Sequence, residues 1–456
     1  MDSVLTSAAA LIVTLGLLIA FHEFGHFWVA RRMGVKVLRF SIGFGRPLWS
    51  KKSGDDQTEY VLAAIPLGGY VKMLDEREGE VPPAELHRAF NRQPVRKRIA
   101  IVVAGPLFNF IFAIMAYFVM YLIGVPGVKP IIGEVTQASP AAQAGIVKGD
   151  EFVKVGNQET PTWNTVRMAL LEESLDNDRI VIQYKDAAGD VHGAQLDVKG
   201  MSMEEKQRNL VQHLGIEPFR PAYPAIIGDL SADGAAQRDG LRTGDKILAV
   251  NGKEVSLWED WVDVIRQNPE HTLKVDLERN GEVQVIMLTP KREQTEAGET
   301  IGRIGASPQV SEDLINQYRA VVSYGPVKAM WTAVTETWRM AVLTLRMLGK
   351  MLVGEVSLKN LSGPITIATY AGYTASIGLT TFLSFLAVVS ISLGVLNLLP
   401  IPILDGGHLL VYLIEGVKGK ALSEDVQARM QHVGMVILAM LMMLAFYNDI
   451  RRLLGE

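Results

Sequence analysis

Two histidines and a glutamate lie inside the first apolar segment of the chain and carry its strongest chemical signal. His22, Glu23 and His26 form a His-Glu-x-x-His pattern within the uncharged run around them, residues 4–30. Histidines four residues apart share one face of a helix, as the paired imidazole ligands of a zinc ion require. The glutamate between them is placed to take a proton from an attacking water. The alternative is a pair of packed histidines with a glutamate that reaches the membrane interface.

A zinc site that performs hydrolysis needs a third protein ligand, and Asp405 is the candidate. No Asp, Glu, Lys or Arg occurs between Lys359 and Asp405, so this carboxylate ends a long uncharged run. The prolines of the preceding Pro-Ile-Pro sequence interrupt helical hydrogen bonding, and the Gly-Gly pair that follows allows an unusual turn. The backbone can therefore bring Asp405 towards the histidines. Two alternatives are that Asp405 caps the following helix and that His408 is a ligand or a neighbour of the ligands.

Together the two motifs resemble the paired signatures of the site-2 proteases, which are zinc metalloproteases that cut other membrane proteins within the bilayer. The second signature, Asn-x-x-Pro-x-Pro-x-Leu-Asp-Gly-Gly, occupies residues 397–407, and the resemblance extends over nearly the whole chain. It implies one zinc ion per chain. The roles that it implies are zinc ligand for His22, His26 and Asp405, general base for Glu23, and a polar contact to the substrate carbonyl for Asn397.

The resemblance also implies a class of substrate. This would be a single-span membrane protein, namely an anti-sigma factor already trimmed on its periplasmic side, with remnant signal peptides as a second class. Two other functions compete with proteolysis: a non-catalytic membrane adaptor that senses peptides, and a metal transporter, because intramembrane His and Asp also line ion paths. The presence of the base Glu23 argues against the adaptor. The lack of a further polar relay across the bilayer argues against the transporter.

Composition indicates a membrane protein that carries soluble modules. The chain has 456 residues, 48% of them hydrophobic, and a formal charge of −4, so it can hold several domains and we expect no nucleic-acid partner. It has no cysteine, which excludes disulfides, thiolate catalysis and a cysteine-ligated zinc. Four apolar segments are long enough to span a bilayer, at residues 4–30, 99–123, 377–404 and 433–447.

Basic residues predict the orientation of these spans. Four cations follow the first span and three precede the second, at positions 31, 32, 36, 39 and 96–98, so their connection should be cytoplasmic. Both termini and the long region between the second and third spans would then be periplasmic, in a protein of the cell inner membrane. Arg451 and Arg452 fall on the periplasmic side against this rule, but the earlier clusters outweigh them.

The cytoplasmic connection is predicted to form a membrane-associated β-hairpin. Residues 37–45 and 59–73 are rich in aromatic and β-branched residues and are interrupted by glycines. Such a hairpin can pair with an unwound substrate as an added strand. In site-2 proteases a re-entrant β element has this position, whereas the alternative is an ordinary surface hairpin. The candidate substrate contacts are Gly43, Phe44, Gly45, Gly68 and Gly69.

Gly105-Pro106-Leu107-Phe108-Asn109 in the second span matches a further element of the same family. Asn109 either supports the site or joins helices through a polar contact.

An internal repeat with an offset of 95 residues lies between the second and third spans. Residues 131–135 align with 226–230, and Gly145 and Trp163 align with Gly240 and Trp258. The repeat resembles a tandem of circularly permuted PDZ domains. Such domains usually bind a peptide C-terminus in a groove between a strand and a helix. Ile216 is the candidate groove residue, and the alternative is that the grooves are empty spacers.

The expected fold class is therefore a multi-pass α-helical membrane protein with four transmembrane helices, the cytoplasmic hairpin and two inserted periplasmic PDZ domains of the α+β class. An amphipathic helix at 331–352 should lie in the outer membrane interface, or else pack on the PDZ pair. The predicted segments are the first span (1–36), hairpin region (37–97), second span (98–124), PDZ domains (125–220 and 221–309), interfacial region (310–375), third span (376–415) and C-terminal part with the fourth span (416–456).

The orientation can be tested by labelling, because the chain has no native cysteine. Cysteines introduced at Gln158 and Lys253 should react with an impermeant thiol reagent added outside intact cells, and a cysteine at Lys418 should not. Labelling at Lys418 without labelling at Lys253 would show the opposite orientation.

Overall fold

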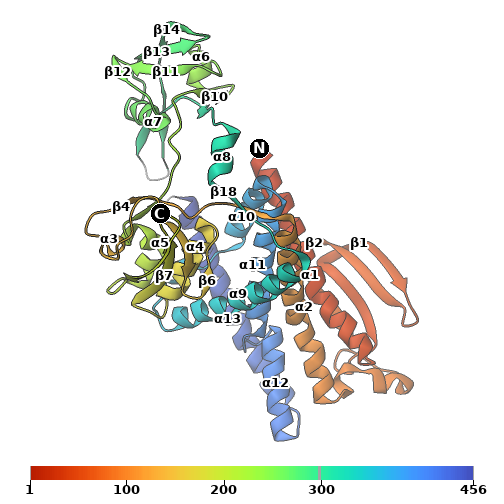
Figure 1. The fold of residues 1–456 in the computed structure, drawn as a ribbon. Coiled ribbons are helices and arrows are strands. Elements are labelled where there is room, and N and C mark those ends of the chain that lie inside the picture. Colours follow the sequence, from red (N-terminus) through yellow and green to blue (C-terminus); the bar gives the residue numbers. More distant parts are fainter. Residues whose placement is uncertain (1, 296–298, 455–456) are drawn as a thin grey trace. The chain divides into compact units, whose positions relative to one another are not determined.

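The computed structural model describes residues 2–295 and 299–454, which fall into two compact units. One unit contains the chain up to Val125 together with Val322–Leu454. The other contains Pro126–Val321. Figure 1 shows the course of the chain through both.

Among the described residues, four helices, all in the first unit, are long and apolar enough to cross a membrane, as predicted. They are α1 (Asp2–Arg32), α2 (Val95–Ile123), α11 (Leu379–Leu398) and α13 (Glu424–Leu453). The third was predicted to continue to residue 404, but it ends at Leu398. Leu399 precedes a proline and is extended, with φ −64° and ψ 145°, because the proline ring disfavours the helical conformation of the residue before it. A separate helix, α12 (Asp405–Lys418), follows the break.

Helix α2 is the central element of this unit. It contacts α1, α11, α12 and α9 (Pro326–Leu352). Leu18 of α1, Phe112 of α2 and Leu386 of α11 are buried together in one apolar cluster. The α1–α2 contact is close, since a Cβ atom on Gly25 would lie 2.4 Å from the carbonyl oxygen of Ala104. Small residues at such crossings let helix backbones approach one another.

Helix α9 packs on the spans with a face of small residues. Ala329, Ala333 and Ala341 are buried, and α9 contacts α2 and α11. The two tryptophans of the predicted apolar stripe, Trp331 and Trp338, are 70% and 73% exposed. A helix is thus present over the predicted residues 331–352 with both tryptophans exposed, and its location in the membrane interface stays a prediction.

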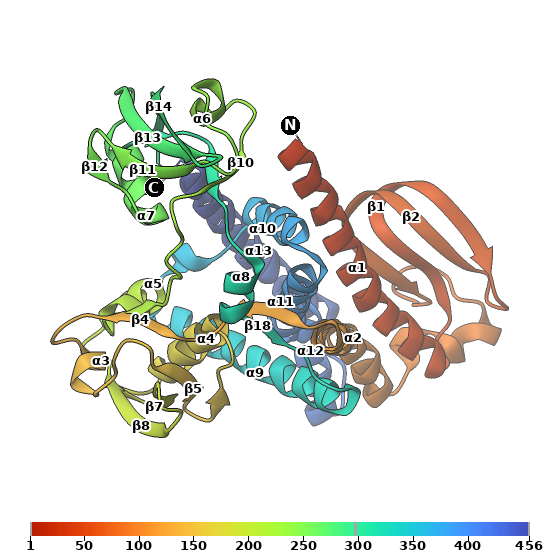
Figure 2. The ribbon, with the colours of Figure 1, turned by 45° about the horizontal axis from the view of Figure 1, so that its top comes forward.

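The predicted hairpin is a sheet of two long bent strands, β1 (Val37–Ser53) and β2 (Thr58–Met73), which pair with each other in more than one register. Residues 58–63 pair with 47–53 on one side and with 39–42 on the other, and residues 37–44 also pair with 65–73. β1 thus runs beyond its predicted end at residue 45. Both ribbon views show this sheet on one side of α1 and helices α2 and α11 on the other (Figure 1, Figure 2).

The remaining elements of the first unit are short. They are η1 (Pro83–Arg88), η2 (Phe90–Arg92), η3 (Leu358–Asn360) and α10 (Pro364–Ile377). α10 contacts α1, and Asp449 of α13 accepts hydrogen bonds from the backbone amides of Gly363, Ile365 and Thr366 at its N-terminus. A buried carboxylate there satisfies amides that the helix leaves unpaired.

The first half of the second unit contains a four-stranded and a two-stranded sheet. The larger has the order β6-β5-β7-β8 and the smaller pairs β4 with β9. Their bounds are β4 (Ile132–Val135), β5 (Glu151–Val155), β6 (Gln158–Glu159), β7 (Arg179–Lys185), β8 (Val191–Asp197) and β9 (Ile216–Pro218). The helices are α3 (Pro140–Gln143), α4 (Trp163–Ser174) and α5 (Met203–His213).

The second half has the same order of elements up to its fifth strand. Its sheets are β12-β11-β13-β14, β10-β17 and β15-β16. The strands are β10 (Ile227–Leu230), β11 (Lys246–Val250), β12 (Lys253–Glu254), β13 (Leu273–Arg279), β14 (Glu282–Leu288), β15 (Lys291–Gln294), β16 (Thr300–Arg303) and β17 (Ala306–Pro308). The helices are α6 (Ala235–Arg238) and α7 (Trp258–Gln267). The β15–β16 hairpin stands where the first half has α5.

Each half has its own apolar core, around Phe152 and Trp261 respectively. A short ribbon of β3 (Val125–Val128) and β18 (Arg319–Val322), with α8 (Glu312–Tyr318) before it, joins the two ends of this inserted region.

Candidate metal centre and active site

Two neighbouring histidines of α1 and an aspartate far along the sequence place their ligand atoms together. Oδ2 of Asp405 lies 3.2 Å from Nε2 of His22 and 3.5 Å from Nε2 of His26, and the two Nε2 atoms are 3.2 Å apart. His22 and His26 come from α1, whereas Asp405 is the first residue of α12. Within the described residues this is the cluster whose donor atoms are suited to hold a metal ion.

These distances fit a tetrahedral zinc site. Bonds of 2.0–2.1 Å to nitrogen or oxygen give about 3.3 Å between neighbouring ligand atoms of a tetrahedron. The three observed separations of 3.2, 3.2 and 3.5 Å bracket this value. Oδ2 of Asp405 is moreover buried without a hydrogen-bond partner, which is costly unless a cation compensates it. Two imidazoles and one carboxylate leave the fourth position free, as in catalytic zinc sites.

The backbone of α2 orients one of the histidines. Nδ1 of His26 donates a hydrogen bond to the carbonyl oxygen of Ile101 at 2.8 Å. Since a carbonyl oxygen can only accept, the ring proton is on Nδ1, and Nε2 presents its lone pair to the cluster. One turn further along α2, a Cβ atom on Gly105 would lie 2.3 Å from Nε2 of His26. Only glycine leaves room for the ligand atoms at this position.

The break after α11 delivers Asp405 from the side. Ile403 has φ +93°, a strained conformation for a β-branched residue. A Cβ atom on Gly406 would lie 2.1 Å from the carbonyl oxygen of Leu399, and one on Gly407 would lie 2.5 Å from that of Ile401. The glycine pair therefore lets the start of α12 fold tightly onto the loop before it. Asp405 does not take the alternative role of a helix cap. Leu404 is the N-cap of α12, and Oδ2 of Asp405 faces the histidines.

A buried ion pair fixes α12 against α2. Arg98 donates two hydrogen bonds to the carboxylate of Glu415, at 2.5 and 3.0 Å, and both side chains are less than 15% exposed. The Arg98 guanidinium also lies 4.8 Å from the centre of the Tyr412 ring. A bidentate pair of this kind sets orientation as well as distance. It holds the helix whose first residue is Asp405.

Glu23 and Asn397 line the same cavity as the three clustered side chains. The cavity has a volume of about 660 Å³. Asn397 lies in the last turn of α11, and His408 also lines the cavity, without joining the ligand cluster. Asp75 and Arg77 line another part of the wall, where Arg77 donates to both carboxylate oxygens of Asp75. Burial raises the pKa of the Asp75 carboxyl, but the hydrogen bonds from Arg77 outweigh this effect and hold its pKa below the usual range.

The hairpin strand that carries the predicted glycines runs beside Glu23. A Cβ atom on Gly69 would lie 2.9 Å from Cγ of Glu23, and Gly69 also lines the cavity. Residues 65–73 pair with 37–44 along one edge, and no strand in the described ranges pairs with the other edge. Gly68 packs on the ring of Phe44, since a Cβ there would lie 2.1 Å from Cε2.

Among the described residues that line this cavity, the predicted Gly43 and Gly45 do not appear. Their φ angles are +92° and +85°, so they form the bend at which β1 changes its pairing partner. These two glycines shape the sheet.

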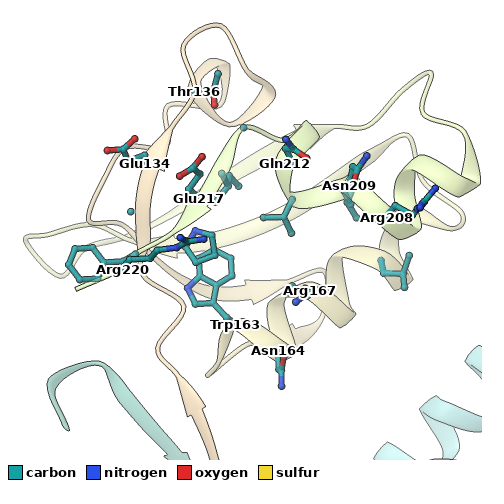
Figure 3. A pocket seen from close by; sticks show the side chains of 18 of the residues that line it. Glu134, Thr136, Trp163, Asn164, Arg167, Arg208, Asn209, Gln212, Glu217 and Arg220 are labelled. Atoms are coloured by element: carbon teal, nitrogen blue, oxygen red, sulfur yellow. The ribbon is translucent and has the colours of Figure 1, made fainter. Parts of the chain in front are cut away.

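Ile216 lies in a different place, on a groove in the first half of the second unit. The groove runs between β9 and helices α4 and α5. Figure 3 shows Asn164 and Arg167 of α4 on one side and Glu217 of β9 on the other. Ile216 is only 2% exposed and its side chain is part of the core, so it supports the groove wall from behind.

Sequence reasoning missed the residues that support the ligands. Ile101 acts through its backbone carbonyl, which every residue has, so its residue type did not indicate this role. Gly105 was noticed as part of a motif, but its contact with both histidines depends on how α1 and α2 cross. The ion pair of Arg98 with Glu415 joins residues 317 apart in the sequence.

Comparison with known proteins agrees with this geometry. Residues 10–441 match the peptidase family M50. The regulator of sigma-E protease RseP of Escherichia coli K12 is 44% identical over 453 residues, which cover 99% of this chain and 100% of that protein. The protease RseP of Yersinia pestis is 45% identical over 453 residues, with the same coverage. A putative zinc metalloprotease of Vibrio cholerae serotype O1 is 44% identical over 454 residues, again 99% of this chain and all of that protein.

The fold, the ligand cluster and the relatives together define a membrane metalloprotease, with four helices among the described residues that are long and apolar enough to cross a bilayer. The chain belongs to peptidase family M50.

The space at Gly105 should be essential for metal binding. Gly105→Ala places a methyl group against both imidazoles, so the purified variant should hold much less metal than the parent chain when metal content is measured by elemental analysis. Gly16→Ala is the matched control, because Gly16 lies on α1 and a Cβ there would meet nothing within 4 Å. Equal metal content in the Gly105 variant and the control would contradict this account of the site.

Proposed function

We propose that this protein is a zinc endopeptidase that hydrolyses a peptide bond of a single-span membrane protein within the bilayer. The observation that carries the proposal is the convergence of His22, His26 and Asp405 at tetrahedral spacing beside Glu23. A zinc ion bound by these three side chains would supply a Lewis acid that polarises the peptide carbonyl and lowers the pKa of a water molecule.

The remaining chemistry belongs to the chain. Glu23 follows His22 on α1 and lines the cavity, so its carboxylate can take the proton from the attacking water and pass it to the leaving amine nitrogen. The Asn397 amide lines the same cavity and can donate to the carbonyl oxygen as negative charge develops there. Asp75 and Arg77 give the cavity a charged part of its wall, which favours entry of water to a site among apolar helices.

The free edge of residues 65–73 is the proposed substrate contact. A helical substrate hides its carbonyl groups in its own hydrogen bonds, so a segment must be extended before it can be cut. Pairing with a strand edge would hold it extended. Gly69 places this edge against Glu23 without a side chain between them, which brings a paired substrate strand to the base.

The relatives named as regulators of sigma-E protease support a role in sigma-E regulation, and the resemblance to the site-2 proteases implies the substrates that we propose. They are an anti-sigma factor already trimmed outside the membrane, with remnant signal peptides as a further class. We assign the enzyme to the inner membrane, with its termini and the inserted unit in the periplasm, as the distribution of basic residues indicates.

The inserted unit is proposed to be a pair of circularly permuted PDZ domains. The shared element order of its halves and the groove between β9 and α4 support this assignment. Both of its ends connect to the first unit, after α2 and before α9. We propose that it acts as a size filter, which admits substrates with a short periplasmic remnant and rejects those with a folded domain.

The roles of the base and the ligands can be separated by substitution. Glu23→Gln keeps the size of the side chain and all three ligands, so zinc should remain bound while cleavage of a model membrane substrate falls by roughly three orders of magnitude or more. His22→Ala and Asp405→Ala should each lose zinc, because each removes a ligand. Zinc content and cleavage are measured on purified full-length protein in detergent. Near-normal cleavage by the Glu23 variant would refute its role as base.

The filter can be tested by deleting residues 128–308. If the inserted unit excludes by size, the deletion variant should still cleave short-remnant substrates and should newly cleave substrates with an intact periplasmic domain. The matched groove variant is Asn164→Trp, which fills the groove from an exposed position on α4 and should have a smaller effect than the deletion. Reduced cleavage of every substrate, with no gain for intact ones, would instead show that the unit anchors substrates.

A further inference from the structure

One face of α2 meets both histidines of the metal site. This face contains residues spaced four apart along α2, namely Ile101, Gly105 and Asn109. His22 and His26 have the same spacing along α1. The carbonyl oxygen of Ile101 accepts a hydrogen bond from Nδ1 of His26, Gly105 leaves space for both rings, and the Asn109 amide contacts Nδ1 of His22. The contact of Asn109 bears directly on His22 as a metal ligand.

The Asn109 side chain is held in one place. It is 1% exposed, and its amide nitrogen lies 3.2 Å from Nδ1 of His22. The backbone carbonyl of Asn109 accepts a hydrogen bond of 2.8 Å from the hydroxyl of Ser390 on α11. Its side-chain oxygen, Oδ1, is buried without a hydrogen-bond partner. A buried amide oxygen without a partner is costly, so this group should have a task.

The direction of this amide decides which tautomer His22 adopts. If the amide nitrogen donates to Nδ1, the ring proton of neutral His22 must sit on Nε2, the atom that faces Asp405 and His26. A protonated Nε2 cannot bind a metal ion. If the amide is rotated by 180°, Oδ1 accepts the proton of Nδ1, and Nε2 is left with a free lone pair. The same rotation gives Oδ1 a partner and moves the amide nitrogen to the position that has none.

We propose that Asn109 is a positioning residue that presents its side-chain oxygen to Nδ1 of His22 and so holds this imidazole in the tautomer that binds zinc. Its role matches that of the Ile101 carbonyl towards His26, so α2 orients both histidine ligands through acceptors two turns apart. Outer partners of this kind typically change metal affinity by about 10- to 100-fold when they are removed. This inference rests on the proposed zinc site, and it assigns Asn109 no contact with substrate.

The test compares the zinc affinity of two Asn109 variants. The proposed role and a purely structural role predict opposite orders for these two affinities. Asn109→Leu removes the acceptor and keeps an apolar side chain of similar size, so zinc affinity should fall by about 10- to 100-fold. Asn109→Asp keeps an acceptor at the same distance and cannot donate, so zinc affinity should stay close to that of the parent chain. If Asn109 only joined helices, the buried carboxylate would be the more damaging of the two.

Zinc affinity is measured on the full-length, metal-stripped chain in detergent by competition with a chelator, and thermal melting in excess chelator reports folding separately. Thr14→Val is the matched control, since Thr14 is a buried polar residue of α1 whose hydroxyl has no partner and lies two turns before His22. Asn109→Ala replaces the leucine variant if the latter does not fold.

Parent-like zinc affinity in Asn109→Leu would overturn the inference, and so would an aspartate variant that binds zinc no better than the leucine variant. His22→Ala is included as a reference. If it keeps its zinc, the proposed site itself is wrong. If it loses zinc while Asn109→Leu does not, only the role of Asn109 is wrong.

Discussion

Three polar ligand atoms must be held within about 3.5 Å of one another among helices that are otherwise apolar, and most of the first unit can be understood from this constraint. Polar groups in such surroundings are costly unless each has a partner. α1 supplies two ligands on one face, and α12 supplies the third. α2 lies against both helices and provides the acceptor for His26, the space at Gly105 and the ion pair that anchors α12. The central helix of the unit is thus the scaffold of the site, although it supplies no ligand itself.

The interruption between α11 and α12 serves the same end. A continuous helix would place successive side chains around its axis at fixed angles, whereas the non-helical loop lets Asp405 approach the histidines from another direction. Backbone without helical hydrogen bonds is tolerated at membrane depth only where protein covers it. Here α13 provides the cover, since its Gly434 packs against the backbone of Pro402. Ile403 in this loop has a strained positive φ, although its side chain is 39% exposed.

Much of the site could be predicted because its chemistry is carried by side chains in recognisable spacing. His22, His26 and Asp405 were expected to meet, and they do. The four spans were also predicted, because length and hydropathy are local properties. The supporting contacts could not be predicted from the sequence. Every residue has a backbone carbonyl like that of Ile101, so residue type does not mark it, and the partners Arg98 and Glu415 lie 317 residues apart. Ile216 does line the predicted groove, but the sequence could not show that its side chain is only 2% exposed and also belongs to the core.

The glycines at the helix contacts also limit how this enzyme can evolve. Gly25, Gly406 and Gly434 each face a backbone carbonyl of another segment, at 2.4, 2.1 and 1.9 Å from the position that a Cβ would take. A clash between side chains can be relieved by making the partner smaller, but a backbone atom cannot be trimmed by any substitution. Damage at these positions should therefore be hard to repair by a second mutation elsewhere. Selection for new substrates is left to act on the exposed sheet, the grooves and the inserted unit, while the helix contacts around the metal site stay unchanged.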